Sequence, residues 1–322
     1  MPKNVFLAFT IAAVGMFACS IAIAGPVGIL VPAYFYPGTG GPGGVGDGWA
    51  AMDSAASQVP ITAILNPNSG PGSSVDPNYV SAATDLEAAG GKVIGYIYTD
   101  NGATALSTVE SQASTYISQY GNLINGFFID GSLIDSSTLS YYQSIDNYIH
   151  GLNSTYTVVS NPGQPYLNGV TPQQYLSTAN VFNIFEGPNV APSTGSAGFN
   201  DYPYGQTWYQ SYPATDFSNI ITGVTSQSVM QSDVSSAVGL GADTVYVADS
   251  SSYANLPSYW TAEVATIASI NSVPAPSGLL LLGLAFVGLF AIRKRGLSNQ
   301  SGLVPREFLA PTSFISGSGL RN

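Results

Sequence analysis

Two carboxylic acids come directly after short apolar runs, where a reaction centre could form. Asp130 follows Gly-Phe-Phe-Ile at 126–129, and Glu186 follows Phe-Asn-Ile-Phe at 182–185. Partial burial at the end of a strand raises the pKa of a carboxyl group, so one member of such a pair can keep a proton that the other has lost. Hydrolysis of a glycosidic bond requires this combination of a protonated and an ionised carboxyl group. Either residue could instead cap the helix that follows it, a role for which Asp is better suited than Glu.

The other reactive side chains argue against several common kinds of catalytic site. His150 is the only histidine, and it falls near the expected C-terminal end of a helix, where the helix dipole stabilises a cation. A Ser-His-Asp triad therefore has no base, and zinc has too few nitrogen and sulfur ligands. Calcium remains open, although the chain has no Asp-rich twelve-residue loop. We expect neither a metal nor a cofactor.

Alternating strand and helix patterns predict the elements that must position the two acids. The eight apolar runs that predict strands are Val27–Tyr36, Ile61–Leu65, Lys92–Tyr98, Gly126–Ile129, Tyr156–Val159, Asn180–Phe185, Phe217–Thr222 and Thr244–Ala248. Helical spacing is found in Pro77–Ala89, Ala105–Tyr120, Ser136–Leu152, Thr171–Ser177, Gln227–Leu240 and Ser258–Ser269. This alternation predicts an α/β fold with a parallel sheet and helical crossovers. The length favours a single (β/α)8 TIM-type barrel, with an open doubly wound sheet as the alternative.

Further polar and aromatic residues stand at the ends of the predicted strands. Because the carboxyl ends of barrel strands converge on one face, we expect these residues to line a groove around Asp130 and Glu186. They are Tyr34, Asn66, Tyr98, Asp100, Asn161 and Asp249. We also assign Trp208 to this groove; it lies in an aromatic-rich loop at 187–215, whose rings could stack on sugars or simply pack the loop. The glycine-rich stretch 37–48 is interpreted as a flexible rim loop.

Both ends of the chain have the composition of targeting segments. Residues 1–24 combine one early lysine, an apolar stretch and Ala-Ile-Ala at 22–24, as in a secretory signal peptide; a buried hydrophobic helix is the alternative. Residues 273–295 combine Pro-Ala-Pro, an apolar run and Arg-Lys-Arg. This segment resembles the PEP-CTERM sorting signal, which implies an exosortase-type membrane peptidase as a partner; an ordinary membrane anchor is the alternative. Residues 296–322 are expected to be disordered.

The stretch between these ends, 25–272, is strongly acidic. It holds 17 of the 18 acids but only one basic residue, Lys92, which gives a formal net charge of −16. Such a surface repels nucleic acid, because phosphate binding needs Lys and Arg. It would attract a polycation, although solubility alone could also explain it. The sole cysteine, Cys19, falls in the leader, so disulfides would be absent from a mature protein that we expect to be a monomer.

The strand-end motifs resemble those of the spherulin-4-like family. The matching stretches are GILVPAYFYPG (28–38), ITAILNPNSGPG (61–72), GYIYTDNG (95–102), GFFID (126–130), VVSNPG (158–163), NIFEGP (183–188) and LPSYW (256–260). The resemblance implies a barrel similar to glycoside hydrolases that cut α-1,4-linked polysaccharides containing galactosamine. In that family the fourth strand ends in an Asp-Glu pair and the sixth in a Glu. Asp130 and Glu186 match two of these positions, but the third is Gly131.

Three hypotheses follow from these observations. The first is a secreted or cell-surface glycoside hydrolase that acts on an amino-sugar exopolysaccharide through Asp130 and Glu186. The second is a catalytically weakened relative that binds matrix polysaccharide, because Gly131 stands where the family has a carboxylate. The third is a coat protein without a ligand, which explains the composition but not the polar residues at the strand ends. Asp135 could reach the site from the following loop.

Overall fold

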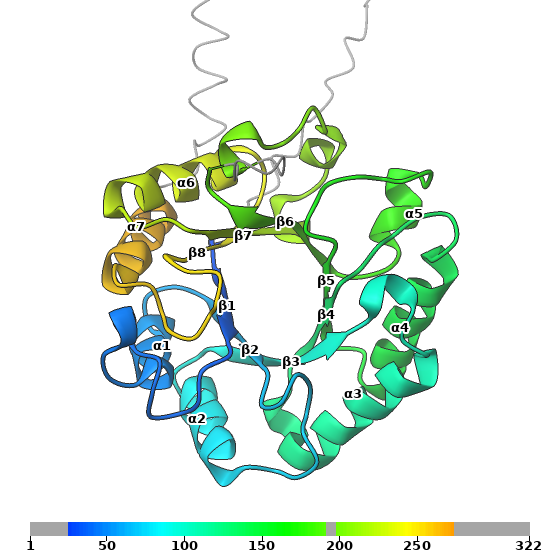
Figure 1. Ribbon diagram of the computed structural model, residues 1–322, viewed down its shortest axis with the longest axis horizontal. Coiled ribbons are helices and arrows are strands. Elements are labelled where there is room, and N and C mark those ends of the chain that lie inside the picture. The colour runs from blue at the N-terminus through cyan, green and yellow to red at the C-terminus, as the bar shows by residue number, and fades with distance from the viewer. Residues whose placement is uncertain (1–24, 191–197, 274–322) are drawn as a thin grey trace, which may run out of the picture. The chain divides into compact units, whose positions relative to one another are not determined.

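Eight parallel strands form the inner wall of the fold, and helices surround them (Figure 1). The computed structural model describes residues 25–190 and 198–273. Each strand pairs with the next one in the sequence, from β1 to β8. The two edges of the sheet meet where Gly28 N–H donates to Asp243 O (2.8 Å) and Val245 N–H donates to Gly28 O (3.0 Å). The sheet is therefore closed, which confirms the predicted TIM-type barrel and excludes the open doubly wound sheet.

All eight strands overlap the apolar runs of the sequence. They are β1 (Ile29–Ala33), β2 (Ile61–Leu65), β3 (Lys92–Tyr98), β4 (Gly126–Asp130), β5 (Thr157–Asn161), β6 (Val181–Pro188), β7 (Phe217–Thr222) and β8 (Thr244–Val247). Their side chains are mostly buried because one face of the sheet lines the barrel interior and the other packs against helices. The polar ends of β4, β5 and β6 extend beyond the apolar runs and so bring Asp130, Asn161 and Glu186 into the sheet itself.

In residues 25–190 and 198–273, seven α-helices lie outside the barrel. They are α1 (Gly48–Ala56), α2 (Pro77–Ala88), α3 (Leu106–Tyr120), α4 (Leu139–Leu152), α5 (Pro172–Leu176), α6 (Gln227–Gly239) and α7 (Trp260–Ser272). Six of them coincide with the predicted helical segments, whereas α1 is not identified by its spacing. It begins because the side chain of Asp47 accepts a hydrogen bond from Trp49 N–H and caps the helix.

Side chains in each strand alternate between the helices and the barrel interior. In β4 the ring of Phe127 contacts Tyr116 of α3, at 6.0 Å between centroids, so this face of the strand points outward. Phe128 and Asp130 point inward, and they pair in register with Tyr96 and Tyr98 of β3. Asp130 therefore lies on the interior face, at the carboxyl end of the barrel.

A shift in the register of β6 places Glu186 on the same interior face. Asn183 pairs with Ser218 of β7, but the next paired residue of β6 is Phe185, so one residue is extra. Residues three apart in a regular strand point to opposite faces. Because of the extra residue, Asn183 and Glu186 both point inward, as a bulge allows.

The targeting segments expected at 1–24 and 273–295 and the tail at 296–322 lie outside the described residues, except for Val273. Within the described parts of the chain, none of the helices has both the length and the apolar composition needed to cross a bilayer.

Candidate active site

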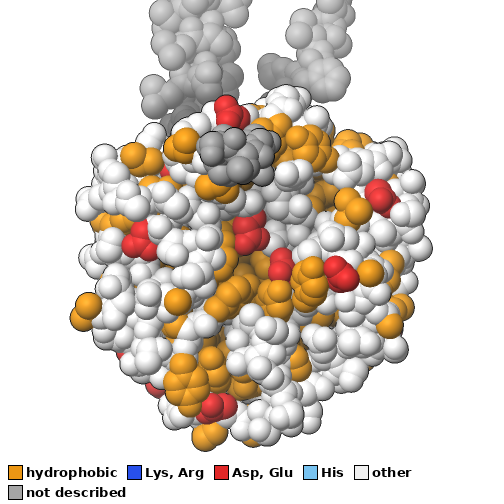
Figure 2. Space-filling model, viewed as in Figure 1, with side chains coloured by type: hydrophobic (Ala, Val, Ile, Leu, Met, Phe, Trp, Pro, Cys, Tyr) orange, Lys and Arg blue, Asp and Glu red, His pale blue; other side chains and the backbone are white. Residues whose placement is uncertain are grey.

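The two carboxyl groups share one amide nitrogen. Asn161 Nδ2, at the end of β5, donates to Asp130 Oδ1 over 2.7 Å and to Glu186 Oε2 over 2.5 Å. These two oxygens are therefore no more than about 5.2 Å apart, the sum of the two bonds. Asn161 is only 6 % exposed, whereas both acids remain partly exposed. Figure 2 shows acidic side chains close together near the centre of this face of the barrel.

Asn161 is held in this orientation by residues deeper in the barrel. Its Oδ1 lies 2.8 Å from the side-chain amide of Asn183, which lies 3.2 Å from Ser218 Oγ. Asn183 and Ser218 are fully buried. The two acids determine which end of the Asn161 amide faces them, because only the NH2 group can donate to both.

Tyrosines bind the remaining oxygens of the acid pair. Tyr96 of β3 donates to Asp130 Oδ2 over 2.6 Å, and Tyr253 of the β8–α7 loop donates to Glu186 Oε1 over 2.7 Å. The ring of Tyr34 contacts those of Tyr96 and Tyr253 edge-on, at 5.6 and 5.7 Å between centroids. Burial raises the pKa of Tyr34, and the charges of Asp130 and Glu186 raise it further. Three tyrosines thus form one wall of the site.

Burial also favours the protonated form of Glu186. Burial raises the pKa of Glu186 above its ordinary value, and the charge of Asp130 acts in the same direction. The hydrogen bonds from Tyr253 and Asn161 lower the pKa but do not cancel this effect. A carboxyl group with a raised pKa beside a second carboxylate suits proton transfer to a leaving group.

The predicted groove residues fall into two groups. Tyr34 and Asn161 contact the acid pair or the tyrosines around it, as described above. The other side chains have local partners: Asn66 accepts from Gly70 N–H (2.8 Å), Asp100 accepts from Tyr98 OH (3.2 Å) and Asp249 accepts from Ser258 N–H (2.9 Å). Tyr98 and Asp100 are still close to the site, because Tyr98 pairs with Asp130 in the sheet. Their roles in sugar binding stay predictions.

Trp208 has the contacts of a packing residue. Its Nε1–H donates to Pro165 O over 2.7 Å, and its ring lies edge-on to Tyr175 and Phe217, at 5.2 and 5.9 Å. The described parts of the β6–β7 loop contain three short 3₁₀ helices; Tyr202, directly after the first, and Tyr209, in the second, are buried. These contacts favour packing over sugar stacking for the aromatic residues of this loop.

Gly131 stands where the family resemblance leads us to expect a carboxylate, and its backbone does not favour a side chain. Its φ is +62°, and a Cβ atom would lie 2.7 Å from Cε2 of Tyr98. Asp135 does not replace the missing group: its Oδ1 accepts hydrogen bonds from Ser137 N–H (2.7 Å) and Thr138 N–H (3.0 Å) in the loop before α4. The side chain of Asp135 therefore stabilises the turn before α4 and has no hydrogen bond to the acid pair in the described structure.

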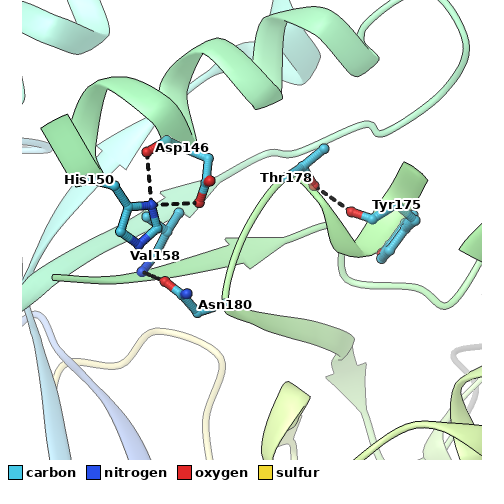
Figure 3. Close-up of polar contacts among 6 residues, drawn as sticks. All are labelled: Asp146, His150, Val158, Tyr175, Thr178 and Asn180. Carbon is cyan, nitrogen blue, oxygen red and sulfur yellow. Dashed lines mark hydrogen bonds and ion pairs between the residues drawn. The ribbon is translucent and has the colours of Figure 1, made fainter. Parts of the chain in front are cut away.

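Among the described residues, His150 has only local partners. Its Nδ1 lies 3.0 Å from Asp146 O and 3.3 Å from Asp146 Oδ1, one turn earlier in the same helix (Figure 3). It is in the last turn of α4, as expected. In the parts of the chain that the structure describes, no group of three or more His, Cys, Asp and Glu side chains is arranged to hold a metal ion.

Two residues of the site are missing from the sequence-based assignment. Tyr96 is two residues before Tyr98 in β3, so the two-residue period of a strand places both on the same face. This signal is present in the sequence. Tyr253 lies in a loop, and no local pattern predicts its contact with Glu186.

Comparison with known proteins gives consistent matches. A model of the family described as spherulation-specific family 4 matches residues 28–267. Spherulin-4 of Physarum polycephalum is 32 % identical over 262 residues, which cover 76 % of this chain and 71 % of that protein. Aspergillus clavatus Sph3, crystallised in complex with GalNAc, has a TM-score of 0.59 and 23 % identity and covers 76 % of this chain and 98 % of its own. This last likeness is one of fold.

Proposed function

The chain belongs to spherulation-specific family 4, and from this premise we propose that it hydrolyses an α-1,4-linked polysaccharide that contains galactosamine. The observation that carries the proposal is the pair formed by Asp130 and Glu186, which share the amide nitrogen of Asn161. The Sph3 structure was obtained with GalNAc, a sugar of the same class. The family membership and the acid pair together support amino-sugar hydrolysis.

In the proposed reaction Glu186 is the general acid and Asp130 the nucleophile. Glu186 has the raised pKa and would protonate the oxygen of the leaving sugar. Asp130 accepts hydrogen bonds from Tyr96 and Asn161, which orient its carboxylate. Retaining glycosidases separate their carboxyl groups by roughly 5–5.5 Å and inverting ones by roughly 6.5–9.5 Å. The limit of about 5.2 Å between the two bridged oxygens supports retention of configuration.

Charge supports a cationic polymer as the substrate. The stretch 25–272 has 17 acids and a single lysine, and Lys92 begins β3 at the opposite end of the barrel from the acid pair. A deacetylated galactosaminan carries ammonium groups that such a surface attracts. We further propose that the protein is exported by its N-terminal leader and sorted at the membrane through residues 273–295.

Gly131 favours a second candidate function, polysaccharide binding without efficient hydrolysis. If the missing carboxylate is the proton donor in active relatives, its loss would lower the rate by about 10²–10⁴-fold. The protein would then hold matrix polysaccharide at the cell surface.

The release of reducing ends from deacetylated galactosaminan distinguishes these functions. For the enzyme we expect release by the parent protein, and a loss of about 10²-fold or more in Glu186→Gln and Asp130→Asn. Glu110→Gln on α3 serves as a matched control and should retain activity. Binding without release by the parent would establish the second function. A parent that neither binds nor cleaves the polymer would contradict both.

A further inference from the structure

An exposed tyrosine ring follows β1 at the end of the barrel where the acid pair lies. The side chain of Tyr36 is 44 % exposed, whereas those of Tyr34, Tyr96 and Tyr253 are only partly exposed. Tyr36 is two residues after Tyr34, and two residues of chain span at most about 7 Å. The Cα atom of Tyr36 is therefore within about 7 Å of that of Tyr34, whose ring contacts those of Tyr96 and Tyr253.

The Tyr36 ring is fixed despite its exposure. Its hydroxyl donates to Asp76 Oδ2 over 3.0 Å and accepts from Asn78 Nδ2 over 2.6 Å. One edge contacts the buried ring of Tyr79, at 5.4 Å between centroids and 79° between planes. Fixing a ring before it binds reduces the entropy that is lost on binding. Tyr36 thus offers a rigid apolar face to a ligand.

Asp76 adds a negative charge at the edge of this face. Its Oδ1 accepts from Asn78 N–H over 2.8 Å and caps α2, so the carboxylate has a fixed position. The same combination occurs on β3, where Tyr98 is 45 % exposed and donates to Asp100. Figure 2 shows hydrophobic side chains running from the central acids toward the α2 side of this face.

We propose that Tyr36, Asp76 and Asn78 form an outer subsite for an amino sugar with a free amine. The inference rests on the proposed function, because the same polysaccharide chain would continue from this subsite to the acid pair. The C–H face of the sugar would lie on the Tyr36 ring. Its ammonium group would be near Asp76, within reach of both the carboxylate and the ring. The charge of the surface favours a sugar with a free amine over an uncharged or anionic one, because residues 25–272 contain 17 acids and a single lysine.

Calorimetric titration of oligosaccharides into the Glu186→Gln protein tests the subsite without hydrolysis. The probes are α-1,4-galactosamine oligomers of equal length, either fully deacetylated or fully acetylated. Tyr36→Ala should weaken binding of the deacetylated oligomer about two- to fivefold, the range of cation–π contacts at exposed sites. Asp76→Asn should weaken binding of the deacetylated oligomer alone, and added salt should reduce the difference. Tyr148→Ala on α4, whose hydroxyl also has a partner, Ser114 Oγ at 2.9 Å, is the matched control.

The possible results separate the subsite from the proposed function. If Tyr36→Ala and Asp76→Asn leave the affinity of the Glu186→Gln protein for the deacetylated oligomer unchanged, the outer subsite is wrong and the proposed function is unaffected. A parent that binds neither oligomer would overturn both. Thermal unfolding of each variant shows whether a weaker affinity reflects lost folding, and Tyr36→Phe, which keeps the ring, should retain most of the affinity.

Discussion

Tyr253 donates its hydroxyl hydrogen to Glu186 over 2.7 Å, although the two residues are 67 positions apart in the sequence. Tyr253 does so from a left-handed backbone conformation, with φ of 51°. Such a conformation costs on the order of 1–3 kcal/mol for a residue other than glycine. The contacts of Tyr253 with Glu186 and with the Tyr34 ring compensate for this cost. The β8–α7 loop therefore acts on the carboxyl group of β6.

Removing the Tyr253 hydroxyl should make Glu186 a weaker acid. The hydrogen bond from Tyr253 lowers the pKa of Glu186, so the pKa should rise in Tyr253→Phe. A general acid must be protonated, and the alkaline limb of the pH–rate profile reports its loss of the proton. We expect this limb to move to higher pH in reducing-end assays. Tyr34→Phe is the control, because no hydrogen bond joins its hydroxyl to either acid in the described structure. A limb that moves to lower pH would contradict the assignment of Glu186.

A side chain at position 131 should destabilise the fold. The φ of +62° at Gly131 costs other residues about 1–2 kcal/mol, and a Cβ atom would also displace Tyr98. We therefore expect Gly131→Ala to lower the free energy of unfolding in urea by at least this amount. Gly151→Ala in α4, where nothing lies within 4 Å of the added Cβ, should be neutral or stabilising. An equal effect of the two changes would show that position 131 is unstrained. The same strain opposes the introduction of a glutamate by Gly131→Glu.

Because several carboxyl groups are buried, we expect the protein to become less stable as the pH rises. Burial raises the pKa of Asp233 and of Asp243 to about 6, and it raises the pKa of the fully buried Glu263 well above its ordinary value. An acid whose pKa is higher in the folded state contributes its full stability below the unfolded pKa and loses that contribution as the pH rises through the folded pKa. We expect the free energy of unfolding to decrease from about pH 4 to above pH 6.

Glu263→Gln tests one part of this pH dependence. Gln keeps an Oε1 that can accept from Val247 N–H, as Glu263 does over 2.8 Å, but it has no proton to lose. The variant should be more stable than the parent at pH 8, and the difference should shrink toward pH 4. Asp135→Asn should act in the opposite direction, because hydrogen bonds from Ser137 lower the pKa of Asp135. Denaturant titrations at several pH values measure both, and a constant difference for Glu263→Gln would contradict the prediction.

Trp208 should contribute to stability rather than to affinity. Its indole packs on Tyr175 and Phe217 and donates to Pro165 O. Trp208→Ala should lower the free energy of unfolding, by less than the roughly 3–5 kcal/mol of a fully buried aromatic residue because Trp208 is partly exposed. Oligosaccharide affinity, measured below the melting temperature, should be unchanged. A loss of affinity at full stability would instead assign Trp208 to the sugar groove.

The sequence predicts the barrel well because its strands are apolar runs that end at turn signals, as in β2 and β3. It also predicts that Asp130, Asn161 and Glu186 share one face. Contacts that depend on distant parts of the chain are not predictable in this way: Tyr253 reaches Glu186 from a loop, and Asp135 is occupied by its own turn. Helix α1 is missed because it follows a glycine-rich stretch, and its start depends on the Asp47 cap.

The extra residue in β6 makes the pairing of this strand part of the reaction centre. Deleting Ile184 would restore regular pairing with β7 and leave Asn183 and the glutamate two residues apart, so both would still point into the barrel. A strand that keeps all three residues from Ile184 to Glu186 but pairs regularly with β7 would instead turn the glutamate toward the surrounding helices. A relative with that regular pairing would therefore need a different residue to face Asp130.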